Sequence, residues 1–312
     1  MPNQRTFYAC QAVALTPQIP SPSDANVFTL GTQRFVHGVQ SIGFNSTFNV
    51  ENIFELGQLE LYDTNLTSAE VEVTIEKVLD GFRTSWGIIS NGSTQLAVAA
   101  KNRADLDFII YADTGNAGVG ATQLSIKCTG MYVNSVSYSF PIEGSPTESV
   151  TLIGNHKAWS GGSLTVPGTV TAGTETAEVL KRSNIVVTAP GGSKKQSVSI
   201  SLSLNREPVY QLGIFAPYAR FATYPVEVTA EVEELLADAA GQDTFSEGTD
   251  EVPVKDQNIS VTAGTTLTVD LGNKCFLSST SQSGGDASGG NATLTNSYTT
   301  YNTFTITDTG AF

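Results

Sequence analysis

Apolar side chains recur at every second position along most of the chain. Residues 197–204 read SVSISLSL, residues 70–76 read EVEVTIE and residues 135–144 read SVSYSFPIEG. Successive side chains of a strand point to opposite faces, so each stretch predicts a strand with one covered face and one face open to water or a partner. Clusters of Gly, Asn, Pro and Ser separate these short strands. The pattern predicts a mainly β fold, an antiparallel sandwich or barrel.

A few stretches depart from this alternation. Residues 232–241, VEELLADAAG, predict a short helix that ends at a glycine suited to a C-terminal cap, and residues 75–81 predict a weaker equivalent. The acidic residues 241–256 and the Ser/Gly-rich residues 278–296 offer little to bury. We expect both to be exposed loops.

One stretch of the chain occurs twice. Residues 40–57, QSIGFNSTFNVENIFELG, align without a gap with residues 196–213, QSVSISLSLNREPVYQLG. The offset is 156 residues, half of the 312-residue chain. The repeated positions that we expect to make packing contacts between subunits are Asn49, Glu51, Leu56 and Gly57 in the first copy and Asn205, Glu207, Leu212 and Gly213 in the second.

Further matches follow in the same order. EVEVTIE at 70–76 matches PVEVTAE at 225–231, Lys-Cys at 127–128 matches Lys-Cys at 274–275, and ESVTLIG at 148–154 matches FTITDTG at 304–310. These matches predict a tandem duplication. The expected domains are residues 1–156 and 157–312, each a β-sandwich or barrel with a short flanking helix.

The repeated Asn-x-Glu has two interpretations. A carboxylate pair formed by Glu51 and Glu207 is conceivable in a glycosidase. Alternatively, the asparagine accepts a turn conformation, the glutamate bonds nearby backbone or a neighbouring chain, and the following glycine supplies a positive φ. Since the fragment occurs in both halves, a repeated packing contact is favoured over one asymmetric active site.

The charge of the chain limits its partners. The net charge is −14, with 7 basic and 14 acidic residues in the first half and 9 and 16 in the second. A chain that is acidic throughout lacks the cationic stripe needed to grip nucleic acid, although it could surround DNA without binding it. Three scattered cysteines indicate free thiols in a reducing cytoplasm. We see neither a secretory signal nor an apolar run long enough for a membrane span.

Patterns of catalytic or metal-binding chemistry are missing from the sequence. The chain has two histidines, no Gly-x-Ser-x-Gly, and neither His-x-x-x-His nor Cys-x-x-Cys spacing. The sequence therefore predicts no catalytic residues, no cofactor and no metal site, and a protein that is not an enzyme.

Residues 39–62, 70–81 and 135–159 together resemble the tail tube proteins of tailed bacteriophages, especially those of aquatic and cyanobacterial phages. The resemblance is strongest from about residue 35 to 160 and recurs, diluted, in the second half. It implies a β-sandwich with a flanking helix, rings of six such domains, and stacked rings that form a conduit for DNA ejection. A chain with two copies implies a ring of three chains, a pseudo-hexamer, although six full-length chains per ring is an alternative.

The resemblance also implies partners and a location. The chain would bind copies of itself, enclose the tape measure protein and genomic DNA without specific binding, and contact sheath, baseplate and terminator proteins. It would be assembled in the host cytoplasm and reside in the virion tail. The alternating serines Ser197, Ser199, Ser201 and Ser203 are the candidate channel lining. Alternative functions are a tail terminator, baseplate hub, neck or decoration protein, a carbohydrate-binding or adhesin module, and a hydrolase.

Overall fold

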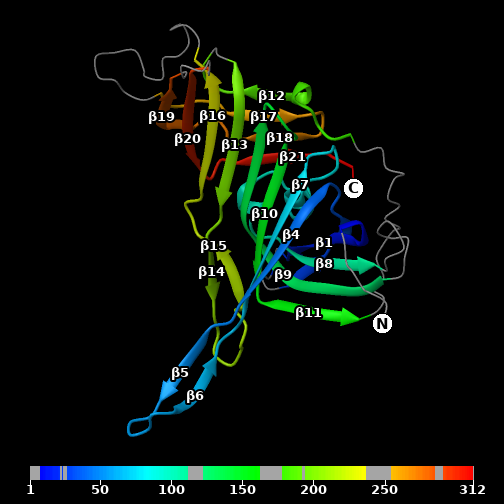
Figure 1. Cartoon of the computed structure of the whole chain (residues 1–312), viewed down its shortest axis with the longest axis vertical. Helices are drawn as coiled ribbons and strands as arrows, with labels where there is room; N and C mark the ends of the chain where they lie inside the picture. The colour runs from blue at the N-terminus through cyan, green and yellow to red at the C-terminus, as the bar shows by residue number, and fades with distance from the viewer. Residues whose placement is uncertain are drawn as a thin grey trace.

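The computed structural model describes residues 8–21, 23, 27–111, 122–161, 178–191, 194–236, 254–284 and 291–311. Antiparallel strands dominate the molecule, which confirms the mainly β fold (Figure 1). The strands are β1 (Gln11–Pro20), β2 (Phe28–Leu30), β3 (Arg34–Phe35), β4 (Val39–Thr47), β5 (Val50–Phe54), β6 (Leu61–Leu66), β7 (Glu70–Val78), β8 (Arg103–Tyr111), β9 (Thr122–Pro141), β10 (Thr147–Gly154), β11 (His156–Gly161), β12 (Ile185–Thr188), β13 (Lys195–Ser203), β14 (Arg206–Val209), β15 (Ala219–Ala222), β16 (Glu227–Leu235), β17 (Ser260–Ala263), β18 (Leu267–Asp270), β19 (Phe276–Ser283), β20 (Thr293–Tyr301) and β21 (Thr305–Asp308).

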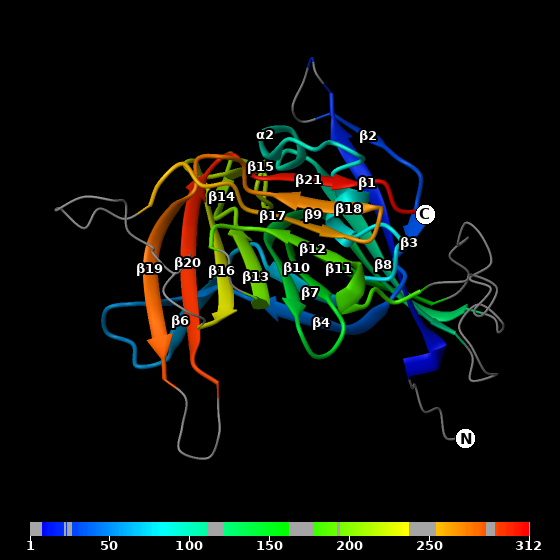
Figure 2. The ribbon, with the colours of Figure 1, turned by 90° about the horizontal axis from the view of Figure 1, so that it is seen from above.

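Eight strands form one continuous inner sheet in the order β4-β7-β10-β9-β13-β16-β20-β19. The first four come from the first half of the chain, and the last four from the second half in the corresponding order. The two sets join where β9 pairs antiparallel with β13. Seen from above, β19, β20, β16 and β13 lie side by side in this order (Figure 2).

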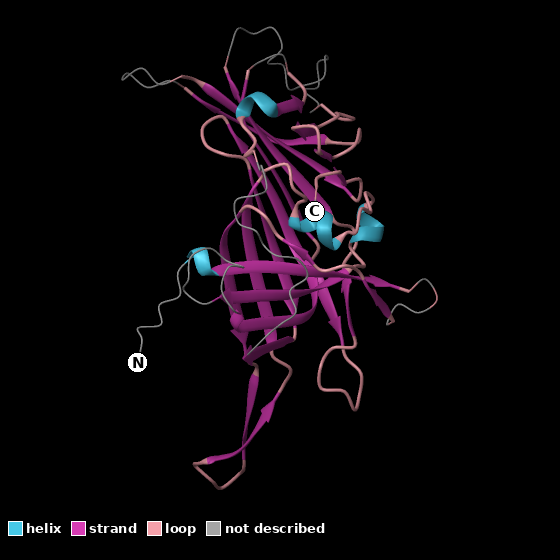
Figure 3. Ribbon diagram, turned by 90° about the vertical axis from the view of Figure 1, so that its right-hand side faces the viewer, coloured by secondary structure: helices cyan, strands magenta, loops and turns pink. Residues whose placement is uncertain are grey.

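An outer layer of strands covers one face of the inner sheet. In the first half its order is β11-β9-β8-β1, with β2 and β3 on the far edge of β1. In the second half the order is β12-β17-β18-β21, which repeats β1-β8-β9-β11. The side view shows strands of one layer crossing those of the other (Figure 3). The 20-residue β9 serves both layers, its beginning pairing with β8 and β11 and its end with β10 and β13.

The repeated order makes each half a sandwich of the same topology. β11 begins at residue 156, the expected boundary, and pairs with β9 of the first half. The division into two independent domains stays a prediction, because one hydrophobic core runs through both halves.

Alternation along the inner strands separates a dry face from a wet one. In β13 the apolar residues Val198, Ile200 and Leu202 are buried, whereas Ser199 and Ser201 are exposed. β7 and β16 show the same alternation of buried apolar and more exposed polar positions. Burying the apolar set against the outer layer supplies the hydrophobic stabilisation of both sandwiches.

The helices lie elsewhere than predicted. Residues 75–78 belong to β7 and residues 232–235 to β16, because both stretches keep a period of two and pair with neighbouring strands; residues 237–241 lie outside the described part. The first half instead carries α1 (Ser85–Ile89) and α2 (Leu96–Ala99). Among the described residues of the second half there is no α-helix.

The Ser/Gly-rich stretch is not simply a loop. Residues up to Ser283 form β19 and residues from Thr293 form β20, so these two strands make a hairpin at the edge of the sheet. β19 reads FLSSTSQS, without the apolar alternation that identified other strands. The fold needs no apolar residues at most of these positions because the strand lies at an edge, where its side chains are largely exposed.

Strand pairing also corrects two of the sequence matches. Ser41 pairs with Glu76, and its repeat equivalent Ser197 pairs with Glu233, so β7 and β16 correspond at an offset of 157 rather than 155. A shift of two residues keeps the same face of a strand, which is why the sequences match in the wrong register. ESVTLIG lies in β10 of the inner sheet, but FTITDTG lies around β21 of the outer layer; the counterpart of β10 is β20.

Candidate assembly interface

The inner sheet ends in two free edges. Among the described strands, β4 pairs only with β7 and β19 pairs only with β20. Inside the chain, the two units join through the equivalents of these edge strands: β9 is the equivalent of β19, and β13 is the equivalent of β4. β9 and β13 pair from Ser135 opposite Ser203 to Pro141 opposite Ser197. The free edge β19 of one chain could therefore pair with β4 of another chain in the way that β9 pairs with β13.

The register of β19 can be placed on that of β9 residue by residue. Ser137 pairs with Ser149 of β10, and Ser281 pairs with Thr295 of β20. The same comparison places Ser139 on Ser283 and Ser135 on Ser279. The three serines that β9 presents on the open face of the junction thus have serine equivalents on the free edge. Sequence alone missed this, because the 147-residue match of the two Lys-Cys pairs does not extend through the strands.

The candidate channel-lining serines lie on the uncovered face of the inner sheet. Ser199, Ser201 and Ser203 are exposed and Ser197 is half-buried beside Glu233, to which its hydroxyl donates at 3.0 Å. On the side of the first half, β9 presents serines opposite them. The open face is therefore a surface of hydroxyl groups rather than of apolar side chains.

The charges on the open face are negative. The glutamates that alternate with buried residues along β7 and β16 are Glu70, Glu72, Glu76, Glu227, Glu231 and Glu233. Lys77 of β7 and Lys195 of β13 point to the covered side, where Lys77 lies 3.4 Å from Asp80 and Lys195 pairs with Glu234. The cations of these strands are thus withdrawn from the face that carries the acids.

The repeat-signature residues build two equivalent hairpins, β5–β6 and β14–β15. Gly57 and Gly213 lie in the two turns with φ of 96° and 86°, as predicted for these glycines, and Asn205 has φ of 41°. Leu56 and Leu212, beside them, are 102% and 99% exposed. Both hairpins leave the same end of the inner sheet, and β5–β6 reaches farthest from the body (Figure 1).

Asn49, Glu51 and Glu207 belong to the same hairpins but form no common site. Glu51 accepts a hydrogen bond from Asn65 at 3.3 Å within its own hairpin. Glu207 lies on β14, and both glutamates are exposed on separate hairpins. The structure does not bring together the carboxylate pair that a glycosidase would need.

The β14–β15 hairpin is anchored on the first half of the chain by two arginines. Arg206 Nε donates to the Val133 carbonyl at 2.7 Å, and its guanidinium lies 5.3 Å from the ring centre of Tyr132. Arg220 donates to Asn155 at 3.2 Å and to Glu70 at 3.3 Å. Burial lowers the pKa of Arg206 to about 10, which leaves the guanidinium charged at neutral pH. This hairpin is therefore held by charged and polar contacts.

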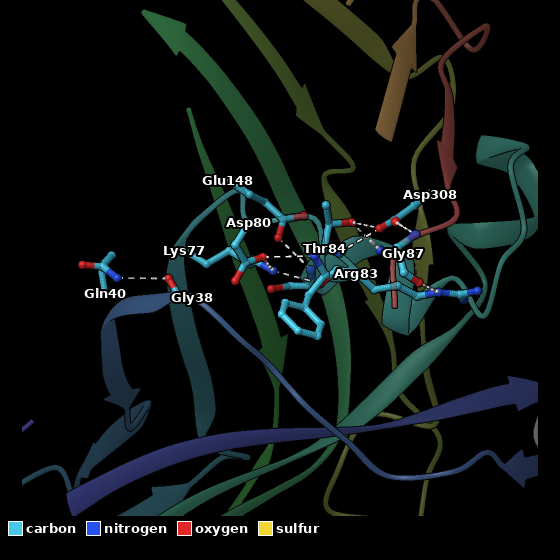
Figure 4. A network of polar contacts seen from close by, with 12 residues as sticks. Gly38, Gln40, Lys77, Asp80, Arg83, Thr84, Gly87, Glu148 and Asp308 are labelled. Carbon is cyan, nitrogen blue, oxygen red and sulfur yellow. Dashed lines mark hydrogen bonds and ion pairs between the residues drawn. The ribbon is translucent and has the colours of Figure 1, made fainter. Parts of the chain in front are cut away.

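A buried polar network that the sequence did not predict joins the two halves (Figure 4). Glu148 of β10 accepts from the backbone N–H groups of Ser85 and Trp86 at 2.7 and 3.2 Å, and from the Tyr138 hydroxyl at 2.9 Å. Burial raises the pKa of Glu148, opposed by the nearby Lys77. The carboxylate thus fixes the first turn of α1 on the covered face of the sheet.

The C-terminal strand completes this network from the other half. Asp308 of β21 accepts from the Thr84 N–H at 2.7 Å and from the Thr84 hydroxyl at 2.8 Å. Thr84 caps α1 by accepting from Gly87 N–H at 2.9 Å. Arg83 N–H donates to the Ala311 carbonyl at 2.9 Å. These contacts fasten the end of the chain to the first unit.

No family model matches the chain, and neither does any curated protein. A chain of the cryo-EM structure of the anti-feeding prophage (AFP) baseplate, 6-fold symmetrised, is similar to it with a TM-score of 0.35 and 9% identity; the match covers 53% of this chain and 100% of that chain. At this score the likeness identifies neither a fold family nor a function. Among the described residues, no helix has the length and apolar character to cross a membrane.

Proposed function

We propose that this chain is a virion structural protein that joins head to tail with copies of itself into rings, which stack into a phage tail tube. The observation that carries the proposal is the repeated strand order of the inner sheet. Inside one chain, the last strand of one unit already pairs with the first strand of the next. When β19 of one chain pairs in the same way with β4 of a neighbour, these two edges are covered. β4 of the first chain and β19 of the neighbour remain free for the next addition.

A heterologous contact of this kind gives a ring if the rotation closes and a filament if it does not. The two units of each chain repeat one arrangement, so three chains supply six equivalent positions. We propose the three-chain ring, a pseudo-hexamer, with six full-length chains as the alternative. The uncovered face of the inner sheet then lines the bore.

The chemistry of that face suits a conduit for DNA. Phosphates are repelled by the glutamates along β7 and β16, and the hydroxyl groups of β9 and β13 keep the wall wet. Lys77 of β7 and Lys195 of β13 lie on the covered side, so these two described strands present no cation to a phosphate in the bore. The proposed contents of the bore are genomic DNA and a tape measure protein. Sheath, baseplate and terminator proteins are the proposed partners outside it.

Cross-linking tests the proposed pairing. Placing β19 on β9 sets Ser281 opposite Asn45 of the neighbouring chain, because Ser137 lies opposite Ser201, the equivalent of Asn45. Directly opposite residues have Cα atoms about 4.5–5.5 Å apart, within disulfide reach, whereas diagonal neighbours at roughly 7–8 Å are beyond it. The variant Asn45→Cys/Ser281→Cys should form intermolecular disulfides. The matched control Asn45→Cys/Ser283→Cys should not.

The native thiols interfere little with this test. Cys10, Cys128 and Cys275 are buried, and burial raises the pKa of Cys128 and Cys275 to about 11. Under oxidising conditions the cross-linked ladder should end at three chains if the ring closes as proposed. Equal cross-linking by the control pair, or none by either, would refute the pairing. Electron microscopy decides the assembly: long tubes support a tail tube, isolated closed rings a terminator or baseplate component, and monomers neither.

A further inference from the structure

The two hairpins of the chain are equivalent in topology but not in their contacts. We infer that the β5–β6 hairpin docks on the β19–β20 edge of the neighbouring chain, against Phe276 and Tyr301, through apolar contacts in place of the arginine contacts inside the chain. This inference rests on the proposed head-to-tail ring. It names the surfaces that meet at the contact between chains.

The docked hairpin β14–β15 supplies the template. Arg206 and Arg220 hold it on the first unit. Strand pairing places Arg206 opposite Ala222 and, in the other hairpin, Val50 opposite Leu66. It likewise pairs Pro208 with Arg220 and Asn52 with Thr64. The equivalents of the two arginines in β5–β6 are therefore Val50 and Thr64, neither of which carries a charge.

The receiving surface changes in parallel. Tyr132 pairs with Ile153 in the first unit, and Phe276 pairs with Thr299 in the second, so Phe276 takes the place of Tyr132. The same comparison of registers places Tyr301 at the position of Asn155. The arginine–tyrosine contact inside the chain thus becomes a valine–phenylalanine contact between chains. Where the first unit has the amide of Asn155, which accepts from the Arg220 guanidinium, the second unit has the aromatic ring of Tyr301.

The surfaces involved are open in the single chain. Val50 is 50% exposed and Leu66 is 60% exposed. Phe276 and Tyr301 are 38% and 44% exposed, and their rings stack with centres 6.4 Å apart. Inside the chain, Arg206 lies over the hydroxylated ring of Tyr132. An arginine at position 50 would instead face the ring of Phe276, which has no hydroxyl group. A valine there buries apolar surface and leaves no charge without a partner.

The partner of this surface is a second copy of the chain. Hairpin β14–β15 of the second described unit lies against the first, whereas β5–β6 belongs to the first of the two described units. It projects from the body (Figure 1). The second unit of a neighbouring chain offers the β19–β20 edge at the equivalent position. The apolar side chains of the two surfaces would be covered together as the strands pair.

Substitution of Val50 by aspartate tests the docking. Val50→Asp and Phe276→Asp each place an unpaired charge in the proposed contact, so closing rings should require at least about tenfold more protein, as for a charge buried at an interface. The matched control is Leu56→Asp at the hairpin tip. Its equivalent Leu212 stays 99% exposed although that hairpin is docked, so the control should close rings at the wild-type concentration. Sedimentation velocity over a concentration series measures the effect. Unchanged unfolding temperatures of the single chains show that all variants fold.

The outcomes separate this inference from the proposed function. If the wild type forms no rings, the proposed function fails first. If Val50→Asp closes rings at the wild-type concentration but no longer stacks them, the hairpin contacts the next ring and the inference is wrong. It is also wrong if Leu56→Asp weakens closure as much as Val50→Asp, because the contact would then involve the whole hairpin without the predicted register.

Discussion

Asp308 should be one of the most important single side chains for stability, although it lies four residues from the end of the chain. Its Oδ2 accepts two hydrogen bonds from Thr84, at 2.7 Å from the N–H and 2.8 Å from the hydroxyl, and its Oδ1 accepts from Gly310 N–H at 3.0 Å. Thr84 is 1% exposed, so no water replaces a lost acceptor. Asp308→Ala leaves a buried N–H and a buried hydroxyl unpaired, and also loosens the cap of α1.

The magnitude follows from these contacts. Hydrogen bonds to a charged group contribute about 1.5–3 kcal/mol each, and two that share one oxygen are not additive, so we expect a loss of about 3 kcal/mol in the free energy of unfolding. For a chain of 312 residues that corresponds to roughly 5 °C in unfolding temperature. Asp308→Asn keeps one acceptor oxygen and should lose about half as much as the alanine variant.

Urea unfolding and calorimetry of the single chain measure this loss. The matched control is Asp63→Ala, which removes an exposed carboxylate that accepts from the neighbouring Thr64 N–H at 2.8 Å. We expect the control to change stability by less than about 0.5 kcal/mol. A loss for Asp308→Ala no larger than that of the control would show that the contact between β21 and α1 does not hold the halves together.

Three further predictions use other parts of the molecule. Arg220→Ala removes the anchor between β15 and the first unit and should cost about 2 kcal/mol, measured by urea unfolding; an unchanged midpoint would mean that the hairpin is held without it. Ser199→Lys places a cation on the open face and should slow DNA release from assembled particles, whereas the neutral Ser199→Asn should not; equal rates for both would count against the face as the bore. Burial raises the pKa of Glu148, so the folded chain takes up this proton at a higher pH than the unfolded chain. Lowering the pH from 7 toward 4.5 should then stabilise the wild type relative to Glu148→Gln, and a difference in unfolding temperature that stays constant with pH would contradict this.

Strands with one dry face could be predicted from the sequence, because burial requires apolar residues at every second position. The turn glycines Gly57 and Gly213 could be predicted as well, since a positive φ at these positions favours glycine. The predicted helix at residues 232–241 is wrong for residues 232–235, which belong to β16. Glu, Leu and Ala are good helix formers, but intrinsic propensity is a small term, and pairing of β16 with both β13 and β20 overrides it.

What the sequence did not reveal depends on long-range partners. The local pattern of an alternating strand is unchanged when the strand is shifted by two residues. The residue-by-residue correspondence of β7 and β16 could therefore be found only from their pairing with neighbouring strands. The free edge β19 escaped notice because its exposed side chains do not need to be apolar. The buried charges Lys77 and Glu148 occupy positions where alternation predicts apolar residues. Lys77 is paired locally with Asp80, whereas Glu148 accepts from Ser85, 63 residues away along the chain.

Fusion of two units has a physical consequence for the proposed ring. Three chains form three contacts from solution instead of six, and each association that is avoided spares a loss of translational and rotational freedom of about 4–15 kcal/mol. The contact inside the chain forms during folding, so it can use two charged side chains: Arg220, which is paired with Glu70, and Arg206, which donates to the Val133 carbonyl. The contact between chains must form from soluble molecules. Its strand edge β19 is rich in Ser, Thr and Gln, and these polar side chains disfavour premature pairing with other strands. In the proposed contact, pairing of β19 therefore sets the register, and the apolar contact at Phe276 supplies affinity.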